Sequence, residues 1–401
     1  MSWRLVFPKA TIQHLGAINS DHSSILLDTQ PTNHYLPRPF RFEAAWTRDT
    51  KCFGIIAEAW KEEVEGSDFL KLCMKQLNTQ LALKKWNKDV IGHCQRRIDV
   101  LLAKIQEIQK QDCTEENCRK EAHLQADLNE WLLRNEILWK QKSREVWLKE
   151  GDKNSKFFHL STIIRRRRNS IDAVKNDSGE WITDRREIQK HFVEKFKTLF
   201  NEEEEEFPKN LENLITPCIT EKENMELCRI PIQSEIKQKL FQLQSLKALG
   251  PDGFPVLFYK KYWAIVGESV TRAITSFFQA GRMPDEVNNS FIVLIPKSQS
   301  PTSFNHYRPI SLCNIVYKII TKLLVSRLRN ILHKLISPTQ ATFIPGRWIA
   351  KNQVIVHEML HSFKTRKVKY GLMAIKIDLQ KAYDRVNWNF LQAVLKNFGF
   401  D

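Results

Sequence analysis

The twenty residues from 371 to 390, GLMAIKIDLQKAYDRVNWNF, constrain this chain more than any other stretch. Apolar residues alternate with smaller or polar ones from Met373 through Ile375 and Ile377, and the pattern stops at a carboxylate, Asp378. This alternation predicts a largely buried β-strand that ends in an acid. Such an acid suits a divalent cation, because Mg²⁺ prefers a few carboxylate oxygens together with substrate phosphates. The alternative is a strand-end acid that is solvated or paired with a neighbour.

A helix is expected directly after this strand. Asn387 can cap its start, and Gly399 suits the left-handed position that often follows a helix. Between them the apolar residues fall on one helical face, formed by Phe390, Leu391, Val394, Leu395 and Phe398.

The positive charge of the chain indicates a polyanionic partner. The 401 residues can hold two or three domains, and 42% hydrophobic content is enough for real cores. The formal net charge is +16, which makes nucleic acid the leading candidate partner. From Lys297 to Lys369, thirteen Lys and Arg residues stand against one acid, Glu358. Because a solvated helix surface normally mixes signs, we expect a polyanion to lie along this segment.

The cysteines and the apolar runs indicate the cellular compartment of the protein. Eight cysteines occur without a CxxC pair, which argues against a structural zinc site and favours reduced thiols. No apolar run is long enough to span a membrane, and the first residues lack the apolar core of a signal peptide. We therefore expect an intracellular protein, in the nucleus or the cytoplasm.

Patterning divides the chain into five parts: a short β fragment at 1–28, a proline-containing linker at 29–50, a helical hairpin at 51–160, a basic hairpin and helix closed by an acidic run at 161–206, and a globular region at 207–401. In the third part we expect one long helix to end near Lys110 and a second to run from about Arg119 to Lys149. Further on we expect a β-hairpin at 171–182, a strand at 291–295, a tight turn at 250–253, and helices at 185–200, 233–246, 257–266, 269–280, 315–335 and 351–364.

Two short segments are candidate sites outside the globular region. Arg165, Arg166, Arg167 and Arg168 follow aromatic residues, a combination that suits the backbone and bases of RNA. A localisation signal or a solvated cluster would give the same run. Asp21 and His22 lie between two apolar stretches and could belong to a phosphodiesterase site, with the histidine on the phosphate. A polar turn between strands is the alternative.

Four segments in a fixed order resemble the reverse transcriptase of non-LTR (LINE-type) retrotransposons, most like those of plants: KALGPDGFP, IVLIPKSQSPTSFNHYRPISLCNIVYKIITKLL, SPTQATFIPGRWIAKNQ and AIKIDLQKAYDRV. WLKEGDKNSKFFH and RRRRNSI resemble the connecting region of such elements, and SDHSSILL resembles the last motif of their apurinic-type endonuclease. The resemblance implies an RNA-directed DNA polymerase and a mostly helical α+β fold. From about residue 231 it implies the fingers and the first part of the palm of a right-hand polymerase.

The resemblance also assigns roles to residues at the nucleotide. Asp378 corresponds to the first metal-binding aspartate of the palm, and the carbonyl of Leu379 to a second oxygen. Tyr383 corresponds to the aromatic gate beneath the sugar. Lys297 and Arg308 correspond to residues that hold the incoming triphosphate, which suits the point charge of lysine and the planar fork of arginine.

Further residues correspond to the motif that cradles template and primer: Gln340, Phe343, Gly346 and Arg347. Thr342 stands where family members usually have glycine, so the approach of the backbone there is expected to differ. The implied partners are an RNA template, a DNA primer and deoxynucleoside triphosphates, with Mg²⁺ as cofactor.

Catalysis by the resembled family needs more carboxylates than Asp378. Two Mg²⁺ ions are held jointly by acids from two strands, and the second acids, in an aromatic-Ala-Asp-Asp hairpin, do not occur in these 401 residues. We therefore expect a truncated, catalytically incomplete element with an endonuclease remnant at Asp21 and His22. The alternatives are a non-catalytic nucleic-acid-binding protein that uses the 297–369 surface, or an unstable product.

Overall fold

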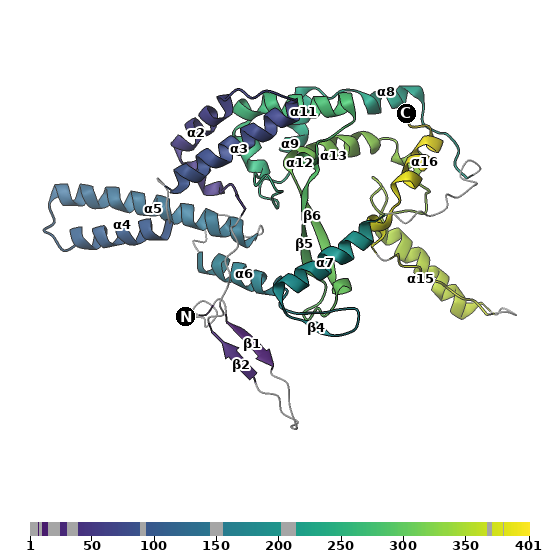
Figure 1. Ribbon diagram of the computed structural model, residues 1–401, viewed down its shortest axis with the longest axis horizontal. Coiled ribbons are helices and arrows are strands. Elements are labelled where there is room, and N and C mark those ends of the chain that lie inside the picture. The colour runs from purple at the N-terminus through teal and green to yellow at the C-terminus, as the bar shows by residue number, and fades with distance from the viewer. Residues whose placement is uncertain are drawn as a thin grey trace.

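The computed structural model describes residues 7, 10–14, 25–29, 39–88, 94–144, 155–201, 214–366, 371–379 and 381–401. Within these ranges the chain is mostly helical, with three two-stranded antiparallel sheets (Figure 1). The expectation of a mostly helical fold is confirmed. None of the helices in the described ranges has both the length and the apolar character needed to cross a bilayer.

The helices are α2 (Thr50–Lys61), α3 (Asp68–Trp86), α4 (Cys94–Ile108), α5 (Glu115–Ser143), α6 (Ser155–Arg168), α7 (Arg185–Phe200), α8 (Glu221–Cys228), α9 (Gln233–Phe241), α10 (Val256–Lys261), α11 (Trp263–Ala280), α12 (Asp285–Asn288), α13 (Ile315–Leu328), α14 (Leu332–Leu335), α15 (Ile349–Thr365) and α16 (Trp388–Phe398). Short 3-10 helices are η1 (Ala44–Arg48), η4 (Phe304–His306) and η5 (Ala382–Arg385). The strands pair as β1 (Thr11–His14) with β2 (Ile25–Asp28), β3 (Val174–Lys175) with β4 (Trp181–Ile182), and β5 (Ser290–Pro296) with β6 (Tyr307–Cys313).

The main core joins two parts of the chain that are far apart in sequence. Phe42 and Trp46 pack with Phe254, Phe258 and Tyr262, and the core continues into α9, α11 and α13. Figure 1 shows α2 and α3 lying beside α11. The expected linker is therefore wrong for residues 39–50, because these aromatic side chains are buried in the core rather than solvated.

A tight turn, Gly250-Pro251-Asp252-Gly253, fastens these two parts together. The Phe42 N–H donates to the Gly253 carbonyl at 2.9 Å, and the Asp252 N–H donates to Asn314 Oδ1 at 3.0 Å. Gly253 has φ +69°, and a Cβ built there would lie 2.3 Å from the Phe40 carbonyl oxygen. The KALGPDGFP segment is thus a packing junction of the core.

The helical hairpin of α4 and α5 extends away from the main core (Figure 1). At its root, Arg134 on α5 pairs with Asp49 at 3.3 Å, and Gln141 accepts a hydrogen bond from the Ala44 N–H at 2.8 Å. The hairpin itself was expected and is confirmed. A single long helix up to Lys110 is wrong, because the chain breaks between α2 and α3 at Gly66 (φ +117°) and Ser67, which caps α3.

A second, small core lies at the far end of the long β5–β6 hairpin. Phe192 on α7 packs edge-on against Tyr307, with ring centres 5.4 Å apart, and Val174 and Ile188 complete the buried set. The β3–β4 hairpin and the bounds of α7 agree with expectation. Strand β6 was not expected, because Pro309 breaks the apolar pattern of its sequence.

Other helix boundaries differ from those expected. The helix expected over 233–246 ends at residue 241, the one expected over 315–335 is divided into α13 and α14, and the two expected over 257–266 and 269–280 are divided instead after residue 261. Gly267 continues α11 because it packs on the Trp263 ring, where a Cβ would lie 2.6 Å away. In contrast, α16 starts at the Asn387 cap and ends at Gly399 (φ +96°), as expected.

The buried strand expected over 373–378 is absent. Residues 371–379 form no strand, and Met373, Ile375 and Ile377 are 79%, 73% and 80% exposed. An apolar alternation becomes a strand only where a neighbouring backbone pairs with it. Within the ranges that the structure describes, this segment has no such partner.

Candidate functional site

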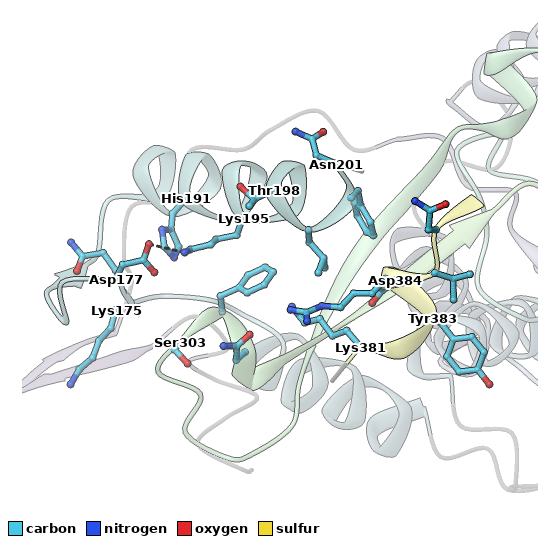
Figure 2. A pocket seen from close by; sticks show the side chains of 18 of the residues that line it. Lys175, Asp177, His191, Lys195, Thr198, Asn201, Ser303, Lys381, Tyr383 and Asp384 are labelled. Carbon is cyan, nitrogen blue, oxygen red and sulfur yellow. Dashed lines mark hydrogen bonds and ion pairs between the residues drawn. The ribbon is translucent and has the colours of Figure 1, made fainter. Parts of the chain in front are cut away.

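The pocket that contains Tyr383 is enclosed by four elements and has a volume of about 860 Å³ (Figure 2). One wall is α7, and the opposite wall is η5 with the start of α16. The β3–β4 turn and the loop at Ser303–Asn305 close the other sides. The residues that contribute most charge to the lining are Lys175, Asp177, His191, Lys195, Lys381, Asp384 and Arg385.

Lys381 is held in the pocket by its backbone and by an aromatic ring. It has φ +52°, and its carbonyl accepts from the Asp384 N–H at 2.9 Å, which starts η5. Its Nζ lies 3.7 Å from the centre of the Phe304 ring, a cation–π contact. Phe304 packs in turn on Phe196 of α7, so the small core fixes the position of this ammonium group.

Three cations gather at this wall. Burial lowers the pKa of Lys381, Asp384 opposes the change, and repulsion from Lys297 and Arg385 lowers the pKa further. Like charges held this close favour an anion that would neutralise them. A phosphate group meets this requirement, since lysine and arginine are its usual ligands.

Lys297 and Arg308 lie on one face of the β5–β6 hairpin. Ile295 pairs with Arg308 in register, and the Lys297 N–H donates to the His306 carbonyl at 2.8 Å. Because side chains alternate along a strand, Lys297 and Arg308 share the face opposite Tyr307, which packs into the small core. The Lys297 ammonium donates to the Asn305 carbonyl at 2.7 Å, and Asn305 lines the Tyr383 pocket. Lys297 therefore contacts a residue of the pocket wall, and Arg308 shares its face of the hairpin.

The predicted template and primer residues lie in one loop, which is held together by hydrogen bonds from one of its own residues. Arg347 donates to the carbonyls of Ile336 at 2.9 Å and Gln340 at 2.7 Å, so its guanidinium organises the loop itself. Gln340 is exposed, and Gly346 has φ +76° with open space around it.

Phe343 stands out in this loop. It has φ +65°, which is uncommon for a residue with a bulky side chain, and follows Thr342, where a glycine was expected. The Phe343 ring is 79% exposed and meets Tyr383 edge-on, with ring centres 6.5 Å apart. The structure thus brings one predicted template residue against the predicted aromatic gate.

Asp378 and Leu379 lie on the exposed segment described above. In the ranges that the structure describes, no three His, Cys, Asp or Glu side chains come together as a potential metal cage. The described residues therefore do not by themselves fit a two-magnesium centre.

The four arginines at the end of α6 have different roles. Arg165 donates to the carbonyls of Lys142 and Ser143, and so satisfies the C-terminal end of α5. Arg167 donates to the carbonyls of Phe7 and Ala10, at 3.0 and 2.9 Å. Arg166 and Arg168 are exposed. Two of the predicted nucleic-acid contacts therefore serve the fold, while Asp21 and His22 lie outside the described residues.

Sequence reasoning missed the pocket walls. Lys381 and Arg385 flank Tyr383 in the same KAYDR segment, so a count of charges around the aromatic residue would have found them. His191 and Lys195 come from α7, which lies far away in sequence, and only the packing of α7 on the small core brings them here.

Comparisons with known proteins agree with the motifs. Residues 295–401 match the family described as "Reverse transcriptase (RNA-dependent DNA polymerase)". The "Transposon TX1 uncharacterized 149 kDa protein" of Xenopus laevis is 25% identical over 337 residues, which are 81% of this chain and 25% of that protein. The "Retrovirus-related Pol polyprotein from type-1 retrotransposable element R2" of Nasonia vitripennis is 27% identical over 139 residues, 35% of this chain and 13% of that protein.

The chain thus spans a quarter or less of the length of these two relatives. The family match and the names of the two relatives agree with the reverse transcriptase motifs read from the sequence.

Proposed function

We propose that this chain acts in RNA-directed DNA synthesis as part of the reverse transcriptase of a non-LTR retrotransposon. Residues from about 231 onward would supply the fingers and the first part of the palm. The partners are an RNA template, a DNA primer and a deoxynucleoside triphosphate. The observation that carries the proposal is the cation group of Lys297, Lys381 and Arg385 beside Tyr383, inside the segment that matches the reverse transcriptase family.

In this proposal the triphosphate lies at the edge of the pocket. Lys297 and Arg308 reach it from one face of the β5–β6 hairpin, and Lys381 reaches it from η5. The sugar and base would lie towards Tyr383 and Phe343, whose rings are exposed and in contact with each other. Mg²⁺ bound with the triphosphate would neutralise phosphate charge.

The test measures binding of a labelled deoxynucleoside triphosphate to the 401-residue chain with Mg²⁺ present. Lys297→Ala and Lys381→Ala should each weaken binding by at least about tenfold, because a hydrogen bond to a charged group contributes roughly 1.5–3 kcal/mol. Arg329→Ala is the matched control, since Arg329 is an exposed cation of the same basic segment at the end of α13. Equal losses in all three variants would contradict the site.

We further propose that the 401 residues bind their substrates without extending a primer. Phosphoryl transfer depends on charges held rigidly in place, whereas Asp378 lies on an exposed segment with no strand partner among the described residues. The same observation favours a second candidate function, nucleic-acid binding without catalysis. Primer extension on an RNA template with Mg²⁺ separates the two, and a processive product would refute the proposed inactivity while leaving the family assignment intact.

A further inference from the structure

Helix α7 presents two parallel stripes to two different environments. Ile188, Phe192 and Phe196 recur at four-residue steps and pack into the small core. His191 and Lys195, one position before Phe192 and Phe196, form a second stripe that lines the Tyr383 pocket together with Thr198 (Figure 2). The core stripe therefore fixes the direction in which the polar stripe points.

Both walls of the pocket carry cationic side chains, and on the η5 wall Asp384 offsets part of that charge. Lys195 and His191 lie on the α7 wall, and Lys381 lies on the wall opposite (Figure 2). Arg385 belongs to η5 and lines the same pocket. The only ion pair drawn across the lining joins Lys195 to Asp177 of the β3–β4 turn, at 2.6 Å. That pair is exposed on the Asp177 side, where 77% of the side chain is accessible. A phosphate can therefore reach Lys195 by displacing an exposed carboxylate.

Aromatic surface is available at the same pocket. Phe200, at the end of α7, is 48% exposed, and Trp388, at the start of α16, is 71% exposed. Cationic side chains beside exposed aromatic rings are the usual combination for single-stranded nucleic acid, because the phosphates need positive charge and the unpaired bases stack.

We propose that this pocket is a binding subsite for single-stranded nucleic acid, in which α7 supplies Lys195 and His191 to the strand phosphates and Phe200 and Trp388 stack its bases. The role of α7 would then extend beyond its packing on the small core. This inference rests on the proposed function only for the choice of nucleic acid as ligand.

Asp177 controls access to Lys195 in this arrangement. Its carboxylate neutralises the lysine in the free protein and adds a negative charge at the mouth of the pocket. Removing that charge should therefore strengthen binding of a polyanion, whereas removing Lys195 should weaken it. Opposite effects from the two members of one ion pair would not arise if the pair served stability alone.

The experiment titrates the full chain into a short fluorescein-labelled oligouridylate and follows fluorescence anisotropy at several salt concentrations. Lys195→Glu should weaken binding by about tenfold and reduce the salt slope by about 0.7, the value for one lost phosphate contact on a single strand. Asp177→Asn should strengthen binding several-fold. Lys190→Glu is the matched control, because Lys190 lies on the same helix, forms an ion pair with Glu194 at 3.9 Å, and is absent from the pocket lining.

Several results would overturn the proposal. Equal weakening by Lys195→Glu and Lys190→Glu would mean that only overall charge matters, and no gain from Asp177→Asn would remove the gating role. A duplex RNA bound as tightly as the oligouridylate would exclude a single-strand subsite. Oligothymidylate in a parallel titration shows whether the strand is the RNA or the DNA.

The two proposals fail separately. Loss of triphosphate binding in Lys297→Ala, with oligouridylate binding retained, would support the nucleotide site independently of the strand subsite.

Discussion

Gly253→Ala should be the most damaging single-methyl change in the main core. The new Cβ would lie 2.3 Å from the carbonyl oxygen of Phe40 and 2.9 Å from Cδ1 of its ring. The nearest atom belongs to the backbone, so no side-chain rotation relieves the contact. The Phe40–Phe42 segment must therefore move away from the turn.

The free energy of unfolding that Gly253→Ala removes has three parts. An L-residue other than glycine at φ +69° costs about 1–2 kcal/mol. Moving the segment breaks the hydrogen bond from the Phe42 N–H to the Gly253 carbonyl, which contributes about 1 kcal/mol. It also loosens Phe42, fully buried and 5.2 Å from the Trp46 ring, where complete removal of a Phe side chain would cost about 3–5 kcal/mol. We expect Gly253→Ala to lower the free energy of unfolding by at least about 3 kcal/mol.

Gly281 provides the matched control. It has φ +66° at the end of α11, but a Cβ there would meet nothing within 4 Å. Gly281→Ala should therefore cost only the conformational part, about 1–2 kcal/mol. Asparagine tolerates positive φ better than alanine. Gly281→Asn should therefore be more stable than Gly281→Ala, while Gly253→Asn should be no more stable than Gly253→Ala.

Urea unfolding followed by tryptophan fluorescence measures these changes, since Trp46 and Trp60 belong to the affected core. The midpoint should fall at least twice as far for Gly253→Ala as for Gly281→Ala. If the two glycines behave alike, or if asparagine rescues position 253, the close approach of Phe40 does not explain the glycine. The packing junction would then be the wrong account of the KALGPDGFP segment.

Two further predictions concern charges. Burial raises the pKa of Asp252 to about 6, above its unfolded value near 3.9, so the contribution of Asp252 to stability is greatest below about pH 4 and falls by at most about 3 kcal/mol as the pH rises through 6. Asp252→Asn should flatten this part of the pH profile in thermal melts, and an unchanged slope would contradict the assignment. Arg165→Ala should lower the melting temperature, because two carbonyls of α5 lose a charged donor at a cost of about 1.5–3 kcal/mol. Arg168→Ala, at an exposed position, should change it little, and equal shifts would show that the arginines of the run are interchangeable.

Local signals in the sequence predicted the elements that depend on local chemistry. Helix α7 has the expected bounds because Asp184 caps it and its apolar residues recur at helical spacing. Helix α16 begins at the Asn387 cap and ends at a left-handed glycine for the same kind of reason. Such signals act within a few residues, so no distant contact was needed to read them.

The predictions that failed depended on partners that the sequence does not name. The alternation at Met373–Asp378 is a genuine strand pattern, but a strand needs a paired backbone, and the described residues offer none there. The linker expected around Phe42 and Trp46 failed because the core that buries them lies more than two hundred residues away. Prolines marked this segment as a loop, which gave no information on whether it is solvated.

Counting charges overestimated the free basic surface for a related reason. Lys318 donates to the Ala248 carbonyl, Arg327 to the Leu227 carbonyl, and Arg347 to three carbonyls of its own loop. A cation that satisfies a partly buried backbone carbonyl is a poor phosphate ligand, because releasing it leaves that carbonyl unpaired, whereas the carbonyl of Asn305 that Lys297 contacts is exposed to water. The charge excess between Lys297 and Lys369 is therefore partly structural.

This distinction narrows where a polyanion can bind. Lysines and arginines in the loop and core positions above would resist a ligand, whereas Lys381, which lines a pocket, is repelled by both Lys297 and Arg385. Such repulsion costs free energy in the unliganded protein and is relieved when an anion binds, so affinity is greatest where the cations are least compensated. By this reasoning the location of binding depends on which cations can turn to a ligand without leaving a buried carbonyl unpaired, and the η5 wall, rather than the basic segment as a whole, is where phosphate should be held most tightly.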